Sequence, residues 1–431
     1  MREKAAVIGM GYVGIPLACL LAKSGVKVTG IDIDRKRVEL INKGEYPLKG
    51  DEPNLPEMLN EVVNTGLLRA STDFECCEDA QAIFICVDTP IDDKKKPIMN
   101  RLISAVDKVG SNLCKDSLIV VESTVAPGTM RNKVLPLLEK NSGMKAGKEF
   151  YLAHCPERVM SGKLIFNLVN LDRVLGGLDE KSTDIAKKWY EPIMKGNIHT
   201  TDMTTAEVVK TSENTYRDVQ IAFANEVALI CEKLGIDAFE VRKLVNTSPF
   251  RDMHLPGAGV GGHCLPKDPW LLVHGGKDAD PQLIPTARKV NDRMPEHVAE
   301  LVLKAMEEAK LDKRKDITIA ILGYSFLENS GDSRNSPAKI VIDRLHKKYN
   351  IAVHDPFAEE DGKVEIVRNL DKVLRNADCA VFLTRHKEYL NLKLEDIAKS
   401  MKNKIIIDGR NIFDKKKAER LGFIYKGIGK G

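Results

Sequence analysis

The residue best placed to do chemistry is Cys264. It follows a glycine-rich run, 257–262, and precedes a run with two prolines, 266–269. The glycines allow the backbone to approach a ligand closely, and the prolines with Asp268 indicate the start of a helix. We therefore expect an exposed thiol near the positive end of a helix dipole, where the nucleophilic thiolate is favoured. The alternative is a small apolar cysteine in a structural turn, but the flanking Lys267 and Asp268 favour the reactive interpretation.

A glycine-rich turn near the N-terminus predicts a dinucleotide site. A strand is predicted at 4–8, the sequence Gly9-Met10-Gly11-Tyr12-Val13-Gly14 follows it, and a helix is predicted over 15–24. The first two glycines permit a tight turn and close approach of a pyrophosphate to the helix N-terminus, and Gly14 permits close helix packing. Strand, glycines and helix together are more specific than the glycines alone.

An acidic residue after the next strand indicates which dinucleotide binds. The strand predicted at 27–31 ends at Asp32, 18 residues beyond Gly14. A carboxylate at this distance can bind the adenosine ribose hydroxyls and would repel a 2'-phosphate. NAD is therefore favoured, and the basic run 35–37 keeps NADP open as an alternative.

A long helix is predicted over 204–234. No Gly or Pro interrupts it, Gly235 follows as a stop, and Thr204 with Glu207 makes a capping box at its start. A helix of this length is expected to cross between domains or to form a subunit contact.

Lys210 and Asn214 share one face of that helix because they are four residues apart. Such a pair alone is typical of a solvated surface. Only a wider pattern would give these two side chains a role in a site.

Polar residues follow further strands of the N-terminal half. The strand predicted at 82–87 is followed by Asp88-Thr89-Pro90, and that at 117–121 by Glu122-Ser123-Thr124. In doubly wound folds the ligand lies beyond the carboxyl ends of the strands. Thr89 and Thr124 are therefore candidate ligand contacts.

The C-terminal third repeats the nucleotide-fold pattern. Strands are predicted at 316–323, 351–355, 379–384 and 404–408. They predict a second parallel sheet with helices between the strands. The first of them lacks the full glycine triplet after it, so we expect the mononucleotide portion of a substrate there instead of a second dinucleotide.

Length and charge limit the class of protein. A chain of 431 residues predicts two or three domains, and 43% hydrophobic with 30% charged residues is typical of a soluble globular protein. A net charge of +4 without a basic face argues against nucleic acid as a partner. No apolar run is long enough for a membrane span, and the sequence enters a strand soon after Met1, so a cytoplasmic protein without a signal peptide is expected.

The cysteines do not predict a disulfide framework or a structural zinc site. The nine cysteines include no Cys-x-x-Cys pair and have no regular spacing. The spacing of His254, His263 and Cys264 fits no common metal site. We expect no metal.

Taken in order, the motifs resemble those of the nucleotide-sugar 6-dehydrogenases, and the resemblance covers nearly the whole chain. The matching segments are Gly9 to Ala18, Ser123 to Thr129, Pro156-Glu157-Arg158, Lys210 with Asn214, Gly261-Gly262-His263-Cys264, Gly331 to Pro337, and Asp408-Gly409-Arg410-Asn411. Within the family, His263 and the Asp268-Pro269-Trp270 run resemble the UDP-N-acetylmannosamine dehydrogenase branch. Lys267 is equally typical of UDP-glucose dehydrogenases.

The resemblance implies an α/β fold with two Rossmann-like doubly wound parallel-sheet domains, joined by a long central helix and a helical middle domain. The implied domains are an NAD-binding domain at 1–203, a central helical domain with the cysteine loop and the dimer contact at 204–300, and a UDP-sugar-binding domain at 313–431. NAD is the implied cofactor, a UDP-sugar the implied substrate, and a homodimer the implied assembly.

The resemblance also implies a four-electron oxidation of a sugar C6 alcohol to a carboxylate. Cys264 would hold the intermediate as a thiohemiacetal and then as a thioester. Lys210 would stabilise the oxyanion, with Asn214 and Asp268 positioning the water or alkoxide. Glu157 is the implied general base, and Thr124 could orient the same water.

Binding residues carry over in the same way. The implied NAD contacts are Gly11, Tyr12, Val13, Asp32, Arg37, Thr89 and Thr124. The implied substrate contacts are Arg158, Val159, Lys210, Asn214, Arg251, His254, Gly261, Tyr324 and Arg410, of which Arg251 resembles an arginine that reaches the partner subunit's site.

Two positions depart from the family pattern. Many relatives carry a second glutamate where this chain has Ser161, so a mechanism that needs that acid does not carry over. Relatives commonly have a lysine where this chain has Leu327, so one cationic substrate contact is missing or supplied elsewhere.

Other functions stay open at this stage. UDP-glucose or UDP-N-acetylglucosamine could be the substrate instead. A two-electron dehydrogenase of the beta-hydroxyacid type would share the glycine turn and the helix lysine but would not need Cys264 or the third domain. A nucleotide-sugar sensor without activity would keep the fold, but Cys264, Lys210 and Glu157 argue against it.

Overall fold

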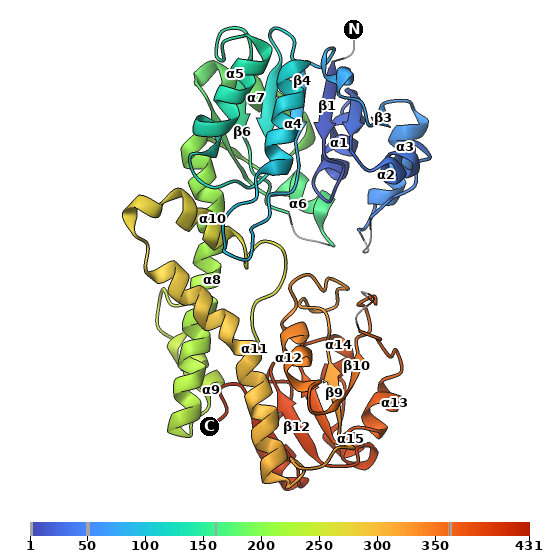
Figure 1. Ribbon diagram of the computed structural model, residues 1–431, viewed down its shortest axis with the longest axis vertical. Helices are drawn as coiled ribbons and strands as arrows, with labels where there is room; N and C mark the ends of the chain where they lie inside the picture. The colour runs from blue at the N-terminus through green and yellow to red at the C-terminus, as the bar shows by residue number, and fades with distance from the viewer. Residues whose placement is uncertain (1–2, 49–51, 160–161, 361, 363) are drawn as a thin grey trace. The chain divides into compact units, whose positions relative to one another are not determined.

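The computed structural model describes residues 3–48, 52–159, 162–360, 362 and 364–431. Ser161, one of the two departures from the family pattern, lies outside the described residues. The chain forms two compact units (Figure 1). Unit 1 is Met1–Glu213 with Trp270–Asp280, and unit 2 is Asn214–Pro269 with Pro281–Gly431.

The sheet of unit 1 has eight strands in the order β3-β2-β1-β4-β5-β6-β7-β8. Its neighbouring strands are parallel except for β6 and β7, which pair antiparallel through Ala153 and His154. The strand order reverses between β1 and β4, which is where a doubly wound fold binds its ligand. The strands are β1 (Lys4–Ile8), β2 (Lys27–Ile31), β3 (Leu68–Ser71), β4 (Ala82–Ile85), β5 (Leu118–Val121), β6 (Tyr151–His154), β7 (Arg173–Gly177) and β8 (Ile198–Asp202).

Helices cover both faces of this sheet. One core cluster packs α1 (Gly14–Lys23), α3 (Leu55–Asn64), α6 (Leu164–Asn170) and α7 (Glu180–Tyr190) against one face, and a second packs α4 (Asn100–Ser111) and α5 (Leu135–Ser142) against the other. Helix α2 (Arg35–Asn42) follows β2. Shorter helical turns lie at Phe74–Cys77, Met130–Val134 and Glu191–Ile193.

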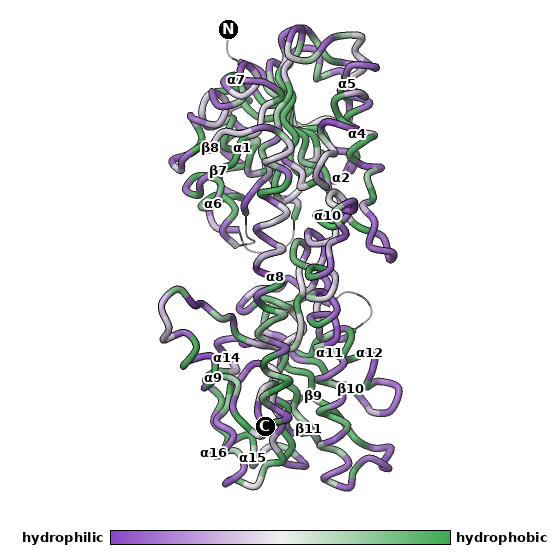
Figure 2. The backbone as a smooth tube through the Cα atoms, turned by 90° about the vertical axis from the view of Figure 1, so that its left-hand side faces the viewer, coloured by the Kyte–Doolittle hydropathy of each residue, from purple (hydrophilic) through white to green (hydrophobic). Residues whose placement is uncertain are grey.

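The sheet of unit 2 has five parallel strands in the order β10-β9-β11-β12-β13. The strands are β9 (Thr318–Leu322), β10 (Asn350–His354), β11 (Cys379–Phe382), β12 (Ile405–Asp408) and β13 (Ile424–Gly427). The inner strands β9, β11 and β12 are strongly hydrophobic because both of their faces are covered, as the green of β9 and β11 in Figure 2 shows.

The two faces of the second sheet carry different helices. On one face lie α11 (Leu283–Glu308), α12 (Pro337–Leu345) and residues from the end of α8 (Met203–Leu234) and from α9 (Ala238–Val245). On the other lie α13 (Leu370–Arg375), α14 (Lys387–Leu390), α15 (Leu394–Ser400) and α16 (Lys415–Arg420).

Helix α8 has 32 residues, and the unit boundary falls within it. The predicted capping box is wrong. The side chain of Asp202, the last residue of β8, accepts hydrogen bonds from the amides of Thr204 and Thr205, so the cap lies two residues before Thr204. The carboxylate of Glu207 instead accepts hydrogen bonds from the amides of Gly128 and Met130.

The predicted α/β fold with two parallel-type sheets and a long central helix is confirmed. Strands β1 and β2 have the predicted bounds, whereas β3, β6, β7, β8 and β13 were not predicted. Within the described residues, none of the helices is both long enough and apolar enough to cross a membrane.

Candidate active site

The glycine turn of unit 1 is built as its sequence predicts. Gly9 has a φ of +91°, and a Cβ there would lie 2.8 Å from the carbonyl oxygen of Cys86. A Cβ on Gly14 would lie 2.0 Å from the carbonyl oxygen of Gly9, so helix α1 starts directly against the turn. A Cβ on Gly11, in contrast, would have no other atom within 4 Å. The turn therefore leaves room at Gly11 for a ligand beside the N-terminus of α1.

Asp32 lies at the carboxyl end of β2 and is buried. Its Oδ2 accepts hydrogen bonds from the amide of Met10 (2.8 Å) and from Nη1 of Arg37 (2.9 Å). The carboxylate is thus fixed against the glycine turn, in the position from which it can bind a ribose. The basic residue Arg37 pairs with this carboxylate, so both predicted NAD contacts at this end of the site lie together.

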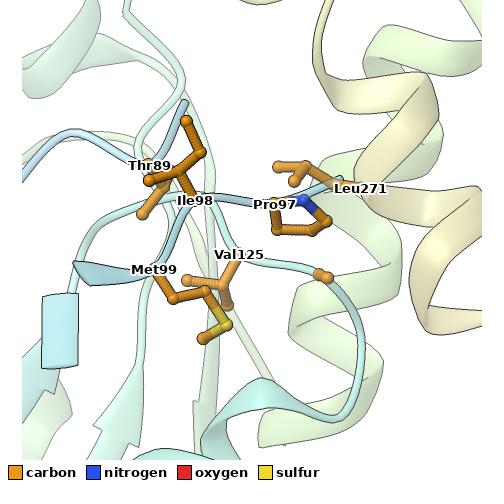
Figure 3. Close-up of a pocket in the computed structure, with 7 residues that line it drawn as sticks. Thr89, Pro97, Ile98, Met99, Val125 and Leu271 are labelled. Carbon is orange, nitrogen blue, oxygen red and sulfur yellow. The ribbon is translucent and has the colours of Figure 1, made fainter. Parts of the chain in front are cut away.

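The loops after β4 and β5 are joined by a hydrogen bond. The hydroxyl of Thr89 donates to the carbonyl oxygen of Thr124 over 2.6 Å, and both residues are buried. A small cavity lies beside this bond, lined by Thr89, Pro97, Ile98, Met99, Val125, Ala126 and Leu271 (Figure 3). Leu271 belongs to α10 (Asp268–Gly275), the helix that follows the cysteine loop.

Glu207 holds the loop that carries Thr124. Its two carboxylate oxygens accept hydrogen bonds from the amides of Gly128 (2.6 Å) and Met130 (2.7 Å), and the side chain is fully buried. Burial raises the pKa of Glu207 to about 7, although the two amides favour its charged form. This contact cannot be predicted from local sequence because Glu207 is distant along the chain from Gly128 and Met130.

Lys210 is buried one turn beyond Glu207, so the interpretation of a solvated surface does not hold for it. His154, the last residue of β6, is buried nearby. Burial lowers the pKa of His154 to about 4, and the charge of Lys210 contributes to the decrease. Nδ1 of His154 lies 2.8 Å from the carbonyl oxygen of Val121. His154 is therefore neutral at pH 7.

The segment after β6 carries the predicted base. Glu157 is half-buried, and its Oε2 accepts a 2.5 Å hydrogen bond from the amide of Val159. Arg158 donates from Nη1 to the carbonyl oxygen of Asp172 (2.8 Å) and forms an ion pair with Glu213 of α8. These three predicted residues lie on one turn, with their side chains held by neighbours.

A buried network behind this turn was missed by the sequence analysis. Glu122 is fully buried, and both of its oxygens accept hydrogen bonds of 3.0 Å from Nη1 of Arg173. The hydroxyl of Tyr190 donates to the same carboxylate. Only the strand order, which places β5, β6 and β7 next to one another, could have indicated it.

In unit 2 the glycines before Cys264 lie against one aromatic ring. A Cβ on Gly261 would lie 2.4 Å from Cβ of Phe326, and one on Gly262 would lie 2.8 Å from its Cζ. Gly262 also has a φ of +92°. The run therefore needs glycine for its packing, and the loop 324–336 supports it.

Cys264 is half-buried, so the expectation of an exposed thiol is only partly correct. Its carbonyl oxygen accepts hydrogen bonds from the amides of Lys267 (3.0 Å) and Asp268 (2.8 Å), which forms the turn leading into α10. Its Sγ lies 3.9 Å from Nδ1 of His263. The predicted helix start after the cysteine is confirmed at Asp268.

Asn214 and Asp268 are brought together. Nδ2 of Asn214 donates to Oδ2 of Asp268 over 2.5 Å. Asp268 is fully buried, and its Oδ1 lies 3.5 Å from Nζ of Lys267. The asparagine of α8 is thereby fixed beside the cysteine loop.

Two predicted substrate contacts on the middle segment differ in exposure. Arg251 is exposed, and its described hydrogen bonds go to the carbonyl oxygens of Pro249 and Phe250. His254 is half-buried, with Nε2 at 3.1 Å from Oε1 of Gln220. Burial and the charge of Arg217 lower the pKa of His254.

The remaining predicted substrate contacts lie at the carboxyl ends of strands in the second sheet. Tyr324, after β9, is fully buried, and its amide donates to Oδ2 of Asp355 (2.7 Å). Arg410, after β12, donates from Nε to the carbonyl oxygen of Leu383 (2.8 Å). Its guanidinium lies against Gly257, where a Cβ would be 2.5 Å from Nη1.

Asp355, which was not predicted as a site residue, accepts several hydrogen bonds at the carboxyl end of β10 in the second sheet. Its Oδ2 accepts from the amides of Tyr324 and Ser325 and lies 3.2 Å from Nε2 of His386. Burial alone would raise the pKa of this carboxyl, but the hydrogen bonds from His386, Ser325 and Ala358 outweigh it and hold the pKa well below its usual range. Leu327 lies in the same loop, 324–336.

Among the described residues, no group of three or more histidine, cysteine or acidic side chains could hold a metal ion. The predicted cofactor contacts lie in unit 1, in the glycine turn, at Asp32 and in the loops that carry Thr89 and Thr124.

Models of three domains match the chain in sequence order. They are the UDP-glucose/GDP-mannose dehydrogenase family NAD binding domain at residues 3–194, the central domain at 204–293 and the UDP binding domain at 320–415.

Relatives of the family match over nearly their whole length. A UDP-N-acetyl-D-mannosamine dehydrogenase of Pyrococcus horikoshii is 40% identical over 431 residues, which cover 99% of each chain. A solved structure of UDP-D-ManNAc dehydrogenase from Pyrococcus horikoshii superposes with a TM-score of 0.92 at 40% identity, covering 100% of both chains. An NDP-N-acetyl-D-galactosaminuronic acid dehydrogenase from Methanosarcina mazei Go1 gives a TM-score of 0.88 at 39% identity, covering 100% of this chain and 95% of that one.

Proposed function

The chain belongs to the UDP-glucose/GDP-mannose dehydrogenase family, and on that premise we propose that it oxidises UDP-N-acetyl-D-mannosamine at C6. The product is UDP-N-acetyl-D-mannosaminuronate. The observation that carries the proposal is the 40% identity over the full length with a UDP-N-acetyl-D-mannosamine dehydrogenase, together with a cysteine loop built to present a thiol.

NAD supplies the chemistry of the oxidation when bound, since it accepts a hydride at each of two steps. The residues of unit 1 fit this cofactor. Gly11, Tyr12 and Val13 would face its pyrophosphate at the N-terminus of α1, and Asp32 would accept the ribose hydroxyls. Thr89 and Thr124 hold each other in the loops at the strand ends, where the nicotinamide portion belongs.

Cys264 provides the covalent step. Its sulfur loses the thiol proton as it adds to the C6 aldehyde left by the first oxidation, which gives a thiohemiacetal. The second oxidation converts this adduct to a thioester, and water then releases the carboxylate and the thiol. Holding the aldehyde on sulfur prevents its loss between the two oxidations.

Other side chains act on the oxygen at C6 and on the water. Lys210 stabilises the negative oxygen of the adduct, and Asn214 with Asp268 orients it. Glu157 takes the proton of the attacking water, which Thr124 orients. Each assignment follows from the match of these residues to the family motifs.

The nucleotide is assigned to residues of the second half of the chain, and the sugar to residues of both halves. Arg410 and Tyr324, at the strand ends of the second sheet, are assigned to the UDP portion, and Gly261 lets the backbone approach the sugar. Arg158, Val159 and His254 complete the substrate contacts. Arg410 provides the cation that a diphosphate requires, given that Leu327 cannot.

The proposal is tested with a panel of substrates. UDP-N-acetylmannosamine, UDP-N-acetylglucosamine, UDP-glucose and GDP-mannose are each supplied with excess NAD, and NADH is counted by absorbance. We expect the first to be preferred and to give two NADH per sugar. One NADH per sugar would instead support a two-electron alcohol dehydrogenase, and a preference for another sugar would reassign the substrate.

A cysteine variant tests the covalent step. Cys264→Ser should reduce turnover on the order of a thousandfold or more, because a hydroxyl is a far weaker nucleophile. The matched control is Cys76→Ser, which removes another half-buried thiol of the described chain. Unchanged turnover in Cys264→Ser would contradict the mechanism.

The proposed assembly is a homodimer through the middle segment. Tyr216, Phe223 and Ile230 repeat every seven residues on α8 and are 66%, 58% and 53% exposed. A stripe of large exposed apolar residues on one helix favours a symmetric contact with a second copy. Light scattering of Phe223→Glu should show a monomer, and Arg251 supplied by the partner would make the monomer inactive as well.

The division at 1–203, 204–300 and 313–431 and a cytoplasmic location also belong to the proposal. A cytoplasmic location is expected because NAD and a nucleotide sugar are charged molecules that do not cross a bilayer unaided. Cell fractionation with an antibody to the chain tests the location. Limited proteolysis tests the division, since cleavage in the segment between α11 and β9 should release the domain at 313–431.

A further inference from the structure

His263 lies next to the reacting sulfur. Its Nδ1 is 3.9 Å from Sγ of Cys264, and both side chains are half-buried. Sulfur forms long hydrogen bonds, so this distance allows a proton to be shared between thiol and imidazole. The two residues are neighbours in one loop of one unit, so their spacing does not depend on any other part of the chain.

The loop holds this pair at both of its ends. Before it, the amide of Gly262 donates to the carbonyl oxygen of Arg334 (2.8 Å), and Nδ2 of Asn335 donates to the carbonyl oxygen of Gly262 (2.9 Å). After it, the carbonyl oxygen of Cys264 accepts from two amides of the turn into α10. These bonds fix the backbone on either side of the pair, from which the two side chains extend.

The charged groups on the surrounding segments are paired with one another. Lys267 lies 3.5 Å from Asp268 within the loop, and Arg334 forms an ion pair with Asp332 on the segment that packs against the glycines. These pairs balance their own charges. The imidazole of His263 is a titratable group in contact with the thiol of Cys264.

We propose that His263 is the proton acceptor and donor for Cys264 in the reaction cycle. This inference rests on the proposed function for its substrate but not for its first step. When sulfur attacks the aldehyde, the Sγ–C6 bond forms, the carbonyl π bond shifts to oxygen, and the thiol proton passes to Nδ1 of His263. When water breaks the thioester, the C6–Sγ bond cleaves and His263 returns that proton to the leaving sulfur.

Proton balance holds over the cycle. His263 begins and ends neutral, Cys264 begins and ends as a thiol, and the oxidant is the NAD of the proposed function. Imidazole suits the task because a ring nitrogen of the neutral ring can accept a proton and later donate it. An adjacent base is also how other enzymes activate a cysteine.

The test measures the thiol without any substrate. Full-length protein is treated with iodoacetamide at several pH values, and alkylation of the Cys264 peptide is followed by mass spectrometry. In His263→Asn the rate at Cys264 near pH 7 should fall about tenfold, and its rise with pH should move to higher pH, because the thiol loses its proton acceptor.

Controls lie within the same molecule. Cys76 and Cys114 are half-buried too, and their alkylation rates should not change in His263→Asn. His274→Asn removes an exposed histidine at the end of α10 and should leave Cys264 as reactive as in the natural chain. If His263→Asn does not fold, as judged by circular dichroism, His263→Gln is measured in the same way.

Equal rates and equal pH profiles at Cys264 in the natural chain and the variant would overturn the inference. Failure of the proposed function is a different outcome, because Cys264 would then be alkylated as expected while none of the sugars is oxidised. Where oxidation occurs, kcat of His263→Asn should fall and recover partly at high pH with KM little changed, whereas a loss of loop structure alone would give no recovery.

Discussion

Nδ2 of Asn214 donates a 2.5 Å hydrogen bond to Oδ2 of Asp268, the residue at which α10 begins. The other oxygen of this fully buried carboxylate lies 3.5 Å from Nζ of Lys267. The carboxylate thus faces one neutral donor and one ammonium. The turn that presents Cys264 is tied to α8 through this pair.

Asn214→Ala should weaken both the fold and the reaction. It removes a donor from a buried carboxylate, for which a loss of about 1–3 kcal/mol in the free energy of unfolding is expected. Urea unfolding measures the stability, and NADH formation measures kcat, which should fall with it. Ser212→Ala, a half-buried change on the same helix, is the control and should stay within about 0.5 kcal/mol of the natural chain.

Gly262→Ala should displace the cysteine loop. The new Cβ would lie 2.8 Å from Cζ of Phe326, at a backbone φ of +92°. We expect a loss of kcat of at least about tenfold, with NAD affinity unchanged because the glycine turn is untouched. Gly25→Ala has a similar φ of +98° but meets nothing within 4 Å, so it isolates the backbone strain. Equal kcat in the two variants would contradict the packing argument.

The raised pKa of Glu207 makes stability depend on pH. A native pKa of about 7 lies above the usual 4.5, so the folded chain binds this proton more tightly than the unfolded chain does. The stabilisation is complete below about pH 4.5 and is lost as pH rises through 7. At about 1.4 kcal/mol per pKa unit, the loss amounts to about 3 kcal/mol.

Comparison with Glu207→Gln measures this loss. The amide does not titrate, so the difference in unfolding free energy between the natural chain and this variant should change between pH 5 and about 8. Glu226→Gln, an exposed change on the same helix, should give a constant difference. Parallel curves for the natural chain and Glu207→Gln would show that Glu207 titrates normally.

Arg410→Lys should weaken substrate binding more than catalysis. Arg410 donates from Nε to the carbonyl oxygen of Leu383 and its guanidinium lies close to Gly257, and a lysine cannot reproduce the planar fork of donors. We expect KM for the UDP-sugar to rise about tenfold or more with little change in kcat. Arg420→Lys, at the end of α16, is the exposed control in the same unit. A fall in kcat at constant KM would contradict a binding role.

Local sequence predicted the strands whose ends are marked by glycines or polar residues. The strands Lys4–Ile8 and Lys27–Ile31 are bounded by glycines and polar residues, so their limits could be read directly. Strand β13 is four residues long and ends at Gly427, which leaves too little pattern to find. The start of α8 was misplaced because Asp202 caps the helix from within a strand.

The candidate site likewise contains parts that the sequence predicted and parts that it did not. The glycine turn, Asp32 and the cysteine loop are contiguous motifs, and the structure gives them the local geometry that their sequence predicts. The contacts of Glu207 with Gly128, and of Glu122 with Arg173, join residues more than fifty positions apart. Such contacts depend on strand order, which a single sequence does not contain.

The ion pair between Asp32 and Arg37 has a consequence for how cofactor preference can evolve. Arg37 already stands at the end of the site where a 2'-phosphate would bind, and the 2.9 Å bond to Asp32 holds it there. Replacing Asp32 by a small neutral residue would remove the repulsive charge and release a guanidinium for the phosphate in one mutational step. We therefore expect the carboxylate of Asp32 to exclude NADP, although the neighbouring Arg37 is already placed to bind its phosphate.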